Sequence, residues 1–366
     1  MAPADPTVAV TINTPRRLRG LDSLRGIAIT TVILFHVQLH FPAPGLLGRI
    51  ALLGYNGVQL FFIVSGLTMC YMWSARKDET WETTKFLIRR LCRIAPPFWF
   101  AIAFYMLWRK TSYSSLEPAG ALDALVTILL AHGFVPRDIN LVVPGGWSIA
   151  AEVEFYILFP LMVSRLGNAS HRLWSALAIY FACTICEVLL EGGTGIDSTV
   201  LYYSLLTQLP IFVAAMALFE MLFSDGVPPP LATLAIVSAI WAIAALAGRA
   251  QEWPTRPGLW AEVALMLLFA AIALKRFEWT FFAFLGRISY SAYLFHFAVI
   301  DLVVAWLPRG SDGANLVDFS IALAIIGSAT IVVAWISSRT LEAWSVSLGR
   351  HLVARLDKST RRRVAA

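Results

Sequence analysis

Residues 23–36 read SLRGIAITTVILFH, an apolar stretch that carries an arginine at position 25 and a histidine at position 36. It is too apolar for an ordinary soluble helix, and with its neighbours it supplies the roughly 20 residues that cross a bilayer. Eleven residues turn an α-helix about three times, so Arg25 and His36 should share one face, roughly 16 Å apart along the axis. An ionisable side chain inside a membrane is costly and requires a partner or a function. The stretch therefore predicts a membrane helix with one functional face.

The composition of the whole chain also indicates a membrane protein. Of its 366 residues, 58% are hydrophobic and only 14% are charged, whereas about a quarter of the residues in a soluble protein are charged. Apolar runs recur along the whole length, which leaves no room for a water-soluble domain of any size. We therefore expect one all-α, polytopic transmembrane helical domain.

Several apolar runs are long enough to span a bilayer. They lie near residues 23–41, 53–74, 93–108, 148–164, 171–190, 200–222, 230–248, 258–274, 282–306 and 315–337. A further run, at residues 121–134, is short for a span. If it does not cross, most of the 29 Lys and Arg residues lie on the side of the N terminus, and if it crosses they divide almost evenly. The positive-inside rule favours the first arrangement. We therefore expect about ten spans, both termini in the cytoplasm, and a short peripheral or re-entrant helix at 121–134.

These boundaries predict a cytoplasmic segment at residues 1–19, a membrane domain at 20–338 and a basic cytoplasmic tail at 339–366. The first apolar run has no cleavage-site pattern, so we expect it to be retained as the first span of a protein of the cytoplasmic (inner) membrane. The tail would contact anionic membrane lipids. Topology explains the net charge of +6, so no nucleic acid is expected as a partner. The four cysteines predict neither a metal site nor a disulfide.

A polar stripe marks the segment GGWSIAAEVEFY at residues 145–156. Ser148, Glu152 and Tyr156 are four residues apart, so they share one face of an otherwise apolar helix. Trp147 precedes the stripe, whereas Glu154 points elsewhere. A carboxylate on such a stripe is expected to face a polar cavity.

A second stripe lies in GRISYSAYLFH at residues 286–296, where Ser289, Tyr293 and His296 share a face. For His296 and the tyrosines, hydrogen bonding between helices explains the pattern as well as chemistry does.

A basic cluster in FLIRRLCRIAPPFW, at residues 86–99, places Arg89, Arg90 and Arg93 at the cytoplasmic start of a span. Anchoring by the positive-inside rule explains this charge without any ligand. Arginine also binds phosphate groups with a planar, bidentate geometry. Both interpretations remain open at this point.

Taken together, these motifs resemble the acyltransferase-3 family of bacterial membrane O-acyltransferases. LDSLRGIAITTVILFH has the family's signature of an arginine and a histidine separated by ten residues. GYNGVQLFFIVSG is similar to its second-span motif, FLIRRLCRIAPPFW to its basic segment, and WSIAAEVEFY and LGRISYSAYLFH follow in the expected order. The resemblance covers nearly the whole chain and implies transfer of an acyl group, usually acetyl, from cytoplasmic acyl-CoA to a hydroxyl of a carbohydrate destined for the cell surface.

The chain departs from the family pattern at two positions. Gln59 stands where an aspartate is expected, so only hydrogen bonding remains there. Val153 replaces an acidic residue that often follows the glutamate, which leaves Glu152 as the matching carboxylate. Some relatives append an extracytoplasmic hydrolase-like domain, and here the membrane domain is expected to complete the transfer alone.

Transfer to a hydroxyl requires a base, because an alcohol is a poor nucleophile at neutral pH. His36 is the expected base, and Glu152 would either fix the tautomer of its imidazole or bind the acceptor's hydroxyls. Arg25, with Arg89, Arg90 and Arg93, is assigned to the phosphates of acyl-CoA. Trp147, Ser148, Tyr156, Gln59, Tyr293 and His296 complete the expected substrate-binding set.

Two alternative functions remain open on the sequence. Intramembrane Arg, His and Glu also build proton relays, so the chain is compatible with a transporter of a surface-sugar precursor. An O-acyltransferase that modifies a small metabolite would keep the chemistry and change only the acceptor.

Overall fold

The structure is a computed structural model that describes residues 16–75, 82–111, 113–135, 137–195, 198–223, 266–274, 279–307 and 314–365. All regular secondary structure in these ranges is helical, as expected for an all-α membrane domain. The elements run along the chain as α1 (Arg16–His40), α2 (Gly45–Leu52), η1 (Leu53–Asn56), α3 (Gly57–Ser74), α4 (Glu82–Trp108), α5 (Ala121–Ile128), η2 (His132–Phe134), α6 (Gly146–Arg165), α7 (Ala169–Thr194), α8 (Ser198–Tyr203), α9 (Leu205–Phe223), α12 (Thr280–Arg287), α13 (Ser289–Trp306), α14 (Leu316–Ser337), η3 (Ser338–Glu342) and α15 (Ala343–Ala365).

Eight helical segments among the described residues are long and apolar enough to cross a membrane. They include the predicted first span and the polar-striped segments. Two of the predicted spans cannot be compared, because residues 230–248 lie outside the described residues and only 266–274 of the span 258–274 lies within them. The short run at 121–134 forms the eight-residue helix α5 and the 3-10 turn η2. Eight residues extend about 12 Å, which is too short to cross the hydrocarbon core.

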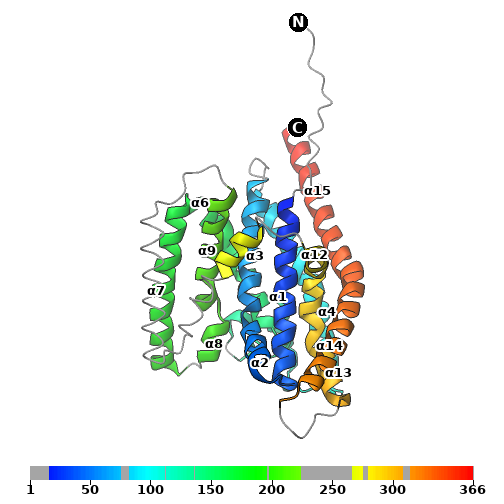
Figure 1. The fold of residues 1–366 in the computed structure, drawn as a ribbon. Coiled ribbons are helices and arrows are strands. Elements are labelled where there is room, and N and C mark those ends of the chain that lie inside the picture. The colour runs from blue at the N-terminus through cyan, green and yellow to red at the C-terminus, as the bar shows by residue number, and fades with distance from the viewer. Residues whose placement is uncertain are drawn as a thin grey trace.

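Helix α1 lies at the centre of the bundle (Figure 1). Glycines allow its close approach to α12, because a Cβ on Gly26 would lie 1.9 Å from the carbonyl oxygen of Phe282 and a Cβ on Gly286 would lie 1.8 Å from that of Asp22. Small residues at such crossings are typical of helix pairs in membranes, where packing rather than the hydrophobic effect holds helices together. Gly26 and Gly286 thus bring the polar face of α1, which carries Arg25 and His36, close to the polar stripe that begins at Ser289.

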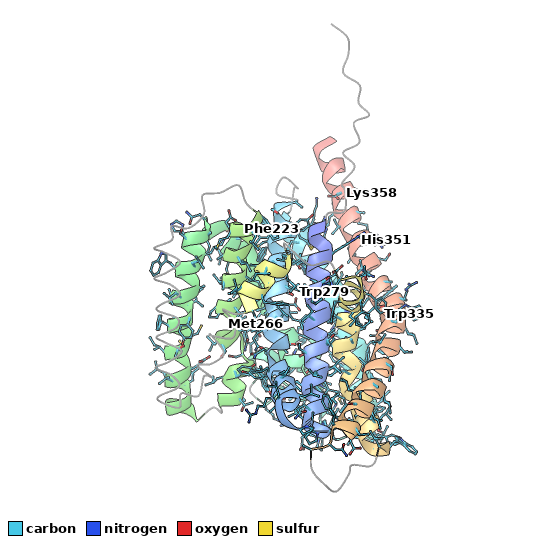
Figure 2. All side chains as sticks on the ribbon, viewed as in Figure 1. Phe223, Met266, Trp279, Trp335, His351 and Lys358 are labelled. Carbon is cyan, nitrogen blue, oxygen red and sulfur yellow. The ribbon has the colours of Figure 1, made fainter. Side chains whose placement is uncertain are left out.

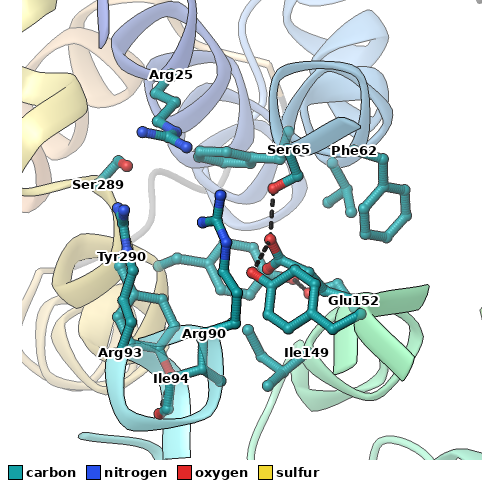
Figure 3. Close-up of a pocket in the computed structure, with 15 residues that line it drawn as sticks. Arg25, Phe62, Ser65, Arg90, Arg93, Ile94, Ile149, Glu152, Ser289 and Tyr290 are labelled. Carbon is teal, nitrogen blue, oxygen red and sulfur yellow. Dashed lines mark hydrogen bonds between the residues drawn. The ribbon is translucent and has the colours of Figure 1, made fainter. Parts of the chain in front are cut away.

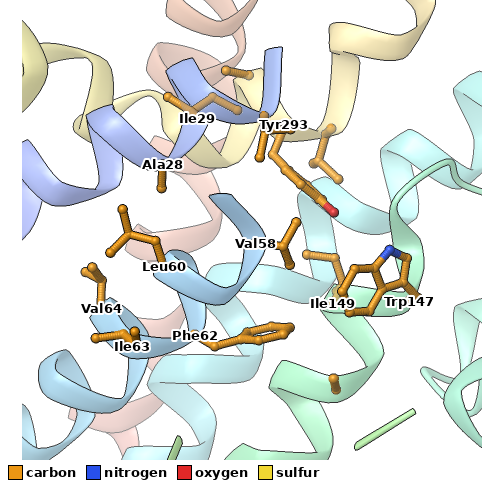
Figure 4. Close-up of a cluster of buried hydrophobic side chains, with 14 of the residues drawn as sticks. Ala28, Ile29, Val58, Leu60, Phe62, Ile63, Val64, Trp147, Ile149 and Tyr293 are labelled. Carbon is orange, nitrogen blue, oxygen red and sulfur yellow. The ribbon is translucent and has the colours of Figure 1, made fainter. Parts of the chain in front are cut away.

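The side of α1 that faces α3 carries the apolar core. Figure 4 shows Ala28 of α1 pointing toward Leu60 of α3, and both belong to one buried apolar cluster that also contains Ile63 of α3 and Trp147 of α6. Ala28 and Ile63 are completely buried. This packing fixes α1 and α3 beside each other, so that their polar residues one turn away face a common space.

The first turn of α1 and the last turn of α15 lie at the same end of the bundle (Figure 1). Residues 339–366, predicted as a basic tail, are helical up to Ala365, because the π-helical turn η3 joins α14 to α15 without a break. Lys85 of α4 forms an ion pair with Asp357, so the helical tail is attached to the bundle. Figure 2 shows His351 and Lys358 along α15, and Lys358 lies beyond the ends of the central helices.

Candidate functional site

A cavity of about 70 Å³ opens between five helices, α1, α3, α4, α6 and α13. Figure 3 shows its polar side chains converging from these helices. The lining residues are Arg25, Val58, Phe61, Phe62, Ser65, Arg90, Arg93, Ile94, Ser148, Ile149, Glu152, Tyr156, Ser289, Tyr290 and Tyr293. Every polar segment that the sequence singles out therefore contributes to one space, although the lining residues are spread along the chain from Arg25 to Tyr293.

Arg25 reaches this cavity from α1. Its guanidinium donates a hydrogen bond of 3.0 Å to the hydroxyl of Thr68 on α3, and it lies 3.7 Å from the carboxylate of Asp22 one turn earlier. Its side chain is only 12% exposed. Arg25 is thus held in place by neighbouring groups while it still faces the cavity.

Two further arginines enter from α4. Arg90 is buried, lies 5.5 Å from the ring centroid of Tyr156, and contacts the sulfur of Met72 at 2.9 Å. Its Nε atom is buried without a hydrogen-bond partner, which is unusual for so strong a donor. Arg93 lines the same cavity one helical turn further on. Arg89 belongs to the same predicted cluster but does not line the cavity.

One carboxylate faces these three cations. Glu152 accepts hydrogen bonds from the hydroxyls of Tyr156, at 2.6 Å, and Ser65 (Figure 3). Ser148, Glu152 and Tyr156 all line the cavity, whereas Glu154, on another face of α6, does not. Three guanidiniums against one carboxylate leave the lining with an excess of positive charge. Such an excess in a buried site favours an anionic ligand.

On the side of α13, hydroxyl groups line the cavity. The hydroxyl of Tyr293 donates a hydrogen bond of 3.0 Å to the carbonyl oxygen of Gly145 and accepts one of 2.9 Å from Ser148. Gly145 adopts a left-handed conformation with φ of 76°, which glycine tolerates. A Cβ at this position would lie 2.8 Å from the Tyr293 hydroxyl, so the glycine leaves room for the tyrosine.

His36 lies beyond this hydroxyl layer and does not line the cavity. Its Nδ1 is 2.8 Å from the carbonyl oxygen of Val32. Because a carbonyl only accepts, Nδ1 carries the proton and Nε2 keeps its lone pair. Glu152 bonds to Ser65 and Tyr156 and makes no bond to His36, so the helix backbone, and not Glu152, holds this tautomer. The alternative role of Glu152, binding the acceptor's hydroxyls, stays a prediction.

A second histidine lies against His36. The two ring centroids of His36 and His296 are 5.1 Å apart. His296 is completely buried, its Nδ1 bonds the carbonyl of Tyr293 at 2.8 Å, and its Nε2 has no hydrogen-bond partner. The ring centroid of His296 is 5.7 Å from that of Tyr293. Tyr293 and His296 therefore connect the cavity to His36 through direct side-chain contacts.

Two other predicted residues lie beside the cavity. Gln59 is buried and donates a 2.7 Å hydrogen bond to the hydroxyl of Tyr202. Trp147 stacks on Tyr203, with ring centroids 4.9 Å apart. Neither residue lines the cavity, so both support helix packing around it.

Sequence reasoning missed three polar residues at the site: Ser65, Thr68 and Tyr290. The first two are hydroxyls three residues apart on the apolar helix α3, so their spacing was a usable signal. Tyr290 lines the cavity and donates to the carbonyl oxygen of Ile94 at 2.8 Å. Nothing in its local sequence distinguishes it from an interfacial tyrosine.

The model of the acyltransferase-3 family, described as an acyltransferase domain, matches residues 18–339. One relative, provisionally named an O-acetyltransferase in Staphylococcus aureus (strain COL), is 23% identical over 346 residues, which cover 85% of this chain and 55% of the relative. O-acetyltransferase OatA of Staphylococcus aureus (strain NCTC 8325 / PS 47) is 22% identical over 330 residues, which cover 81% of this chain and 53% of OatA.

The chain spans about half the length of the curated relatives it matches. No solved structure matches it significantly. The family match covers most of the chain, and apolar helices recur within the matched range. The chain belongs to the acyltransferase-3 family and is a multi-pass membrane protein.

Proposed function

We propose that this protein is a membrane O-acyltransferase that moves an acyl group, acetyl in the first instance, from cytoplasmic acyl-CoA to a hydroxyl of a carbohydrate exported to the cell surface. One observation carries the proposal. Three arginines and one carboxylate line a cavity beside α1, the helix that also carries His36. The family membership and the names of the relatives support acyl transfer to oxygen.

The arginine-lined cavity is the proposed donor site. Arg25, Arg90 and Arg93 carry more positive charge than Glu152 neutralises, and guanidinium groups bind phosphate with charge-assisted hydrogen bonds. We place this end of the bundle in the cytoplasm, because basic residues at the start of α1 and in α15 gather there. Acyl-CoA would then enter from the cytoplasm and direct its thioester along α1 toward His36.

His36 is the proposed general base. Its Nε2 has a lone pair, because Val32 holds the proton on Nδ1. Nε2 takes the proton from the acceptor hydroxyl, the resulting oxygen nucleophile attacks the thioester carbon, and the carbon–sulfur bond breaks. The proton then passes from His36 to the leaving thiolate, which departs as CoA. The reaction thus balances without any metal or redox partner.

The hydroxyls of Tyr293 and Ser148 are the proposed donors to the oxyanion that forms on the thioester carbonyl. Both residues line the cavity, and the ring of Tyr293 also contacts that of His296, which lies against His36. The acyl group has to reach this region. Their present hydrogen bonds end on each other and on Gly145. Substrate binding would redirect the Tyr293 hydroxyl from the Gly145 carbonyl to the oxyanion.

The test is acetyl transfer by the purified protein in nanodiscs with labelled acetyl-CoA. His36→Ala should lower turnover by at least about a hundredfold, the usual range for loss of a general base, while the exposed His171→Ala keeps the wild-type rate. Wild-type turnover in His36→Ala would remove His36 as the base.

Arg25→Ala should mainly raise the KM for acyl-CoA, because it removes a donor contact away from the reacting atoms. If only the KM for the acceptor moved, the assignment of Arg25 to the donor would be wrong. CoA should also raise the melting temperature of the wild-type protein, which is not expected of a simple sugar carrier.

A further inference from the structure

A second, larger cavity lies next to the arginine-lined cavity, and the two share Arg93 as a lining residue. It has a volume of about 520 Å³ and lies between α4, α12 and the continuous helix formed by α14, η3 and α15. Its charged lining residues are Arg93, Arg287, Arg339, Arg350 and Glu342. None of these residues except Arg93 belongs to the predicted site.

The two cavities lie next to each other and share a lining residue, Arg93. At the junction of α12 and α13, Arg287 and Ile288 line the second cavity, and the next two residues, Ser289 and Tyr290, line the first. A ligand that fills both would therefore pass the guanidinium of Arg93.

The second cavity carries more positive than negative charge, because four arginines line it beside one carboxylate, Glu342, although Asp22 also interacts electrostatically with Arg287. Arg287, Arg339 and Arg350 are exposed and form no ion pair with any described carboxylate. Arg339 lies 5.1 Å from the ring centroid of Trp335, a cation–π contact that leaves its hydrogen-bond donors available. The cavity therefore offers several guanidinium groups to a ligand.

The one carboxylate in this lining is turned toward the protein. Glu342 accepts hydrogen bonds from the backbone N–H of Ser291, at 3.0 Å, and from its hydroxyl. These bonds tie the π-helical turn to the start of α13. Turns of this kind occur often at functional sites, and here the turn places Arg339 and Glu342 beside Arg287.

We infer that the second cavity binds the 3′-phosphorylated nucleotide end of acyl-CoA, while the pantetheine arm passes Arg93 into the first cavity. This inference rests on the proposed function. CoA carries a diphosphate and a separate 3′-phosphate, so it needs several cations at one end, and four arginines meet that need better than they match the single phosphate of most lipid headgroups. The first cavity, of about 70 Å³, is too small for a nucleotide, so its arginines would face the diphosphate at the point where the pantetheine arm enters.

The experiment measures the affinity of the full chain, purified in nanodiscs of phosphatidylcholine, for CoA and for 3′-dephospho-CoA. Arg287→Gln and Arg350→Gln should each weaken CoA binding by about tenfold, because each removes a charge-assisted contact to phosphate. At least one of these two variants should lose much less affinity for 3′-dephospho-CoA than for CoA, because that ligand lacks the 3′-phosphate that the substituted arginine would bind. Arg355→Gln, an exposed arginine of α15 outside the cavity, is the matched control and should bind like the wild type.

The outcomes separate this inference from the proposed function. If the wild type binds CoA and both cavity variants keep its affinity, the nucleotide lies elsewhere and the inference is overturned while the donor proposal stands. Phosphatidylglycerol added to the nanodiscs tests a lipid ligand. If it raises the melting temperature of the wild type but not of the two variants, and the variants still bind CoA normally, the cavity is a lipid site and the inference is again overturned. If the wild type binds no CoA at all, both proposals fail.

Discussion

Helices α3 and α7 are both apolar enough to cross a membrane, yet they occupy opposite environments. The segment that contains α3 has a mean hydropathy of 1.6 and 67% of its most apolar stretch is buried; for α7 the values are 1.9 and 33%. The more apolar helix is thus the more exposed one. Exposed Ile185 and Leu189 of α7 face outward, as lipid-facing side chains do, whereas Ser65 and Thr68 of α3 face the cavity and its arginines.

This contrast teaches that hydropathy identifies membrane helices but does not rank them by function. Lipid is as apolar as leucine, so a lipid-facing helix gains nothing from polar or small residues. A helix at the centre needs both: glycines for close approach and hydroxyls to pair with buried charges. Gly57 and Gly66 of α3 pack tightly against neighbouring helices, whereas Gly192 and Gly193 of α7 lie in open space. The hydroxyls of Ser65 and Thr68 bond to Glu152 and Arg25.

The largest expected effect tests burial directly. Ile63→Ala on α3 should lower the free energy of unfolding by about 3 kcal/mol, because Ile63 is fully buried and its removal leaves a cavity. Ile185→Ala on α7 makes the same chemical change at a side chain that is 59% exposed, and should cost less than about 1 kcal/mol. Unfolding in detergent, followed by circular dichroism, measures both. Equal losses would contradict the placement of α7 at the periphery.

A slightly smaller effect is expected from the two glutamates of α6. Glu152→Gln should lower acyl transfer by about a hundredfold, close to 2.7 kcal/mol, because Glu152 is the only carboxylate among the described residues that line the cavity. Glu154→Gln, on another face of the same helix, should stay within about threefold of the wild type. Steady-state turnover with labelled acetyl-CoA distinguishes them. Equal activity in the two variants would show that the face of α6 does not matter.

The smallest of the three effects concerns the glycines of α12 and α14. Gly286→Ala should destabilise the protein by about 2 kcal/mol, because the new Cβ would collide with the backbone of Asp22. Gly327→Ala lies in open space and should stabilise α14 by about 0.5 kcal/mol through its higher helix propensity. Melting temperatures of the two variants should therefore move in opposite directions. An unchanged or raised melting temperature for Gly286→Ala would contradict the close crossing of α1 and α12.

Much of the site could be predicted, because helical periodicity places residues on faces without any knowledge of the fold. The stripe of Ser148, Glu152 and Tyr156 lines the cavity as a unit. The span count could be compared only in part, since residues 230–248 lie outside the described ranges. The short run at 121–134 could be classified because charge and length both argued against a span.

The contacts between helices could not be predicted in the same way. The pairing of His36 with His296 depends on how closely α1 and α13 approach, which no local pattern encodes. The second cavity joins Arg287, Arg339 and Arg350 from segments that are distant in sequence, and it depends on the π-helical turn between α14 and α15. Of the two roles predicted for Glu152, the bond to His36 is not formed, because helix positions fix the faces of these residues but not their depths. The other role, binding the acceptor's hydroxyls, stays a prediction.

The most direct test of the account is a cryo-EM structure of the protein in nanodiscs with a non-transferable ketone analogue of acetyl-CoA. The account predicts phosphate density within hydrogen-bond distance of Arg25 or Arg93, with the acyl end beside Tyr293 and directed toward His36. Density for the analogue at the opposite end of the bundle, or an acyl end that points away from α1, would contradict it.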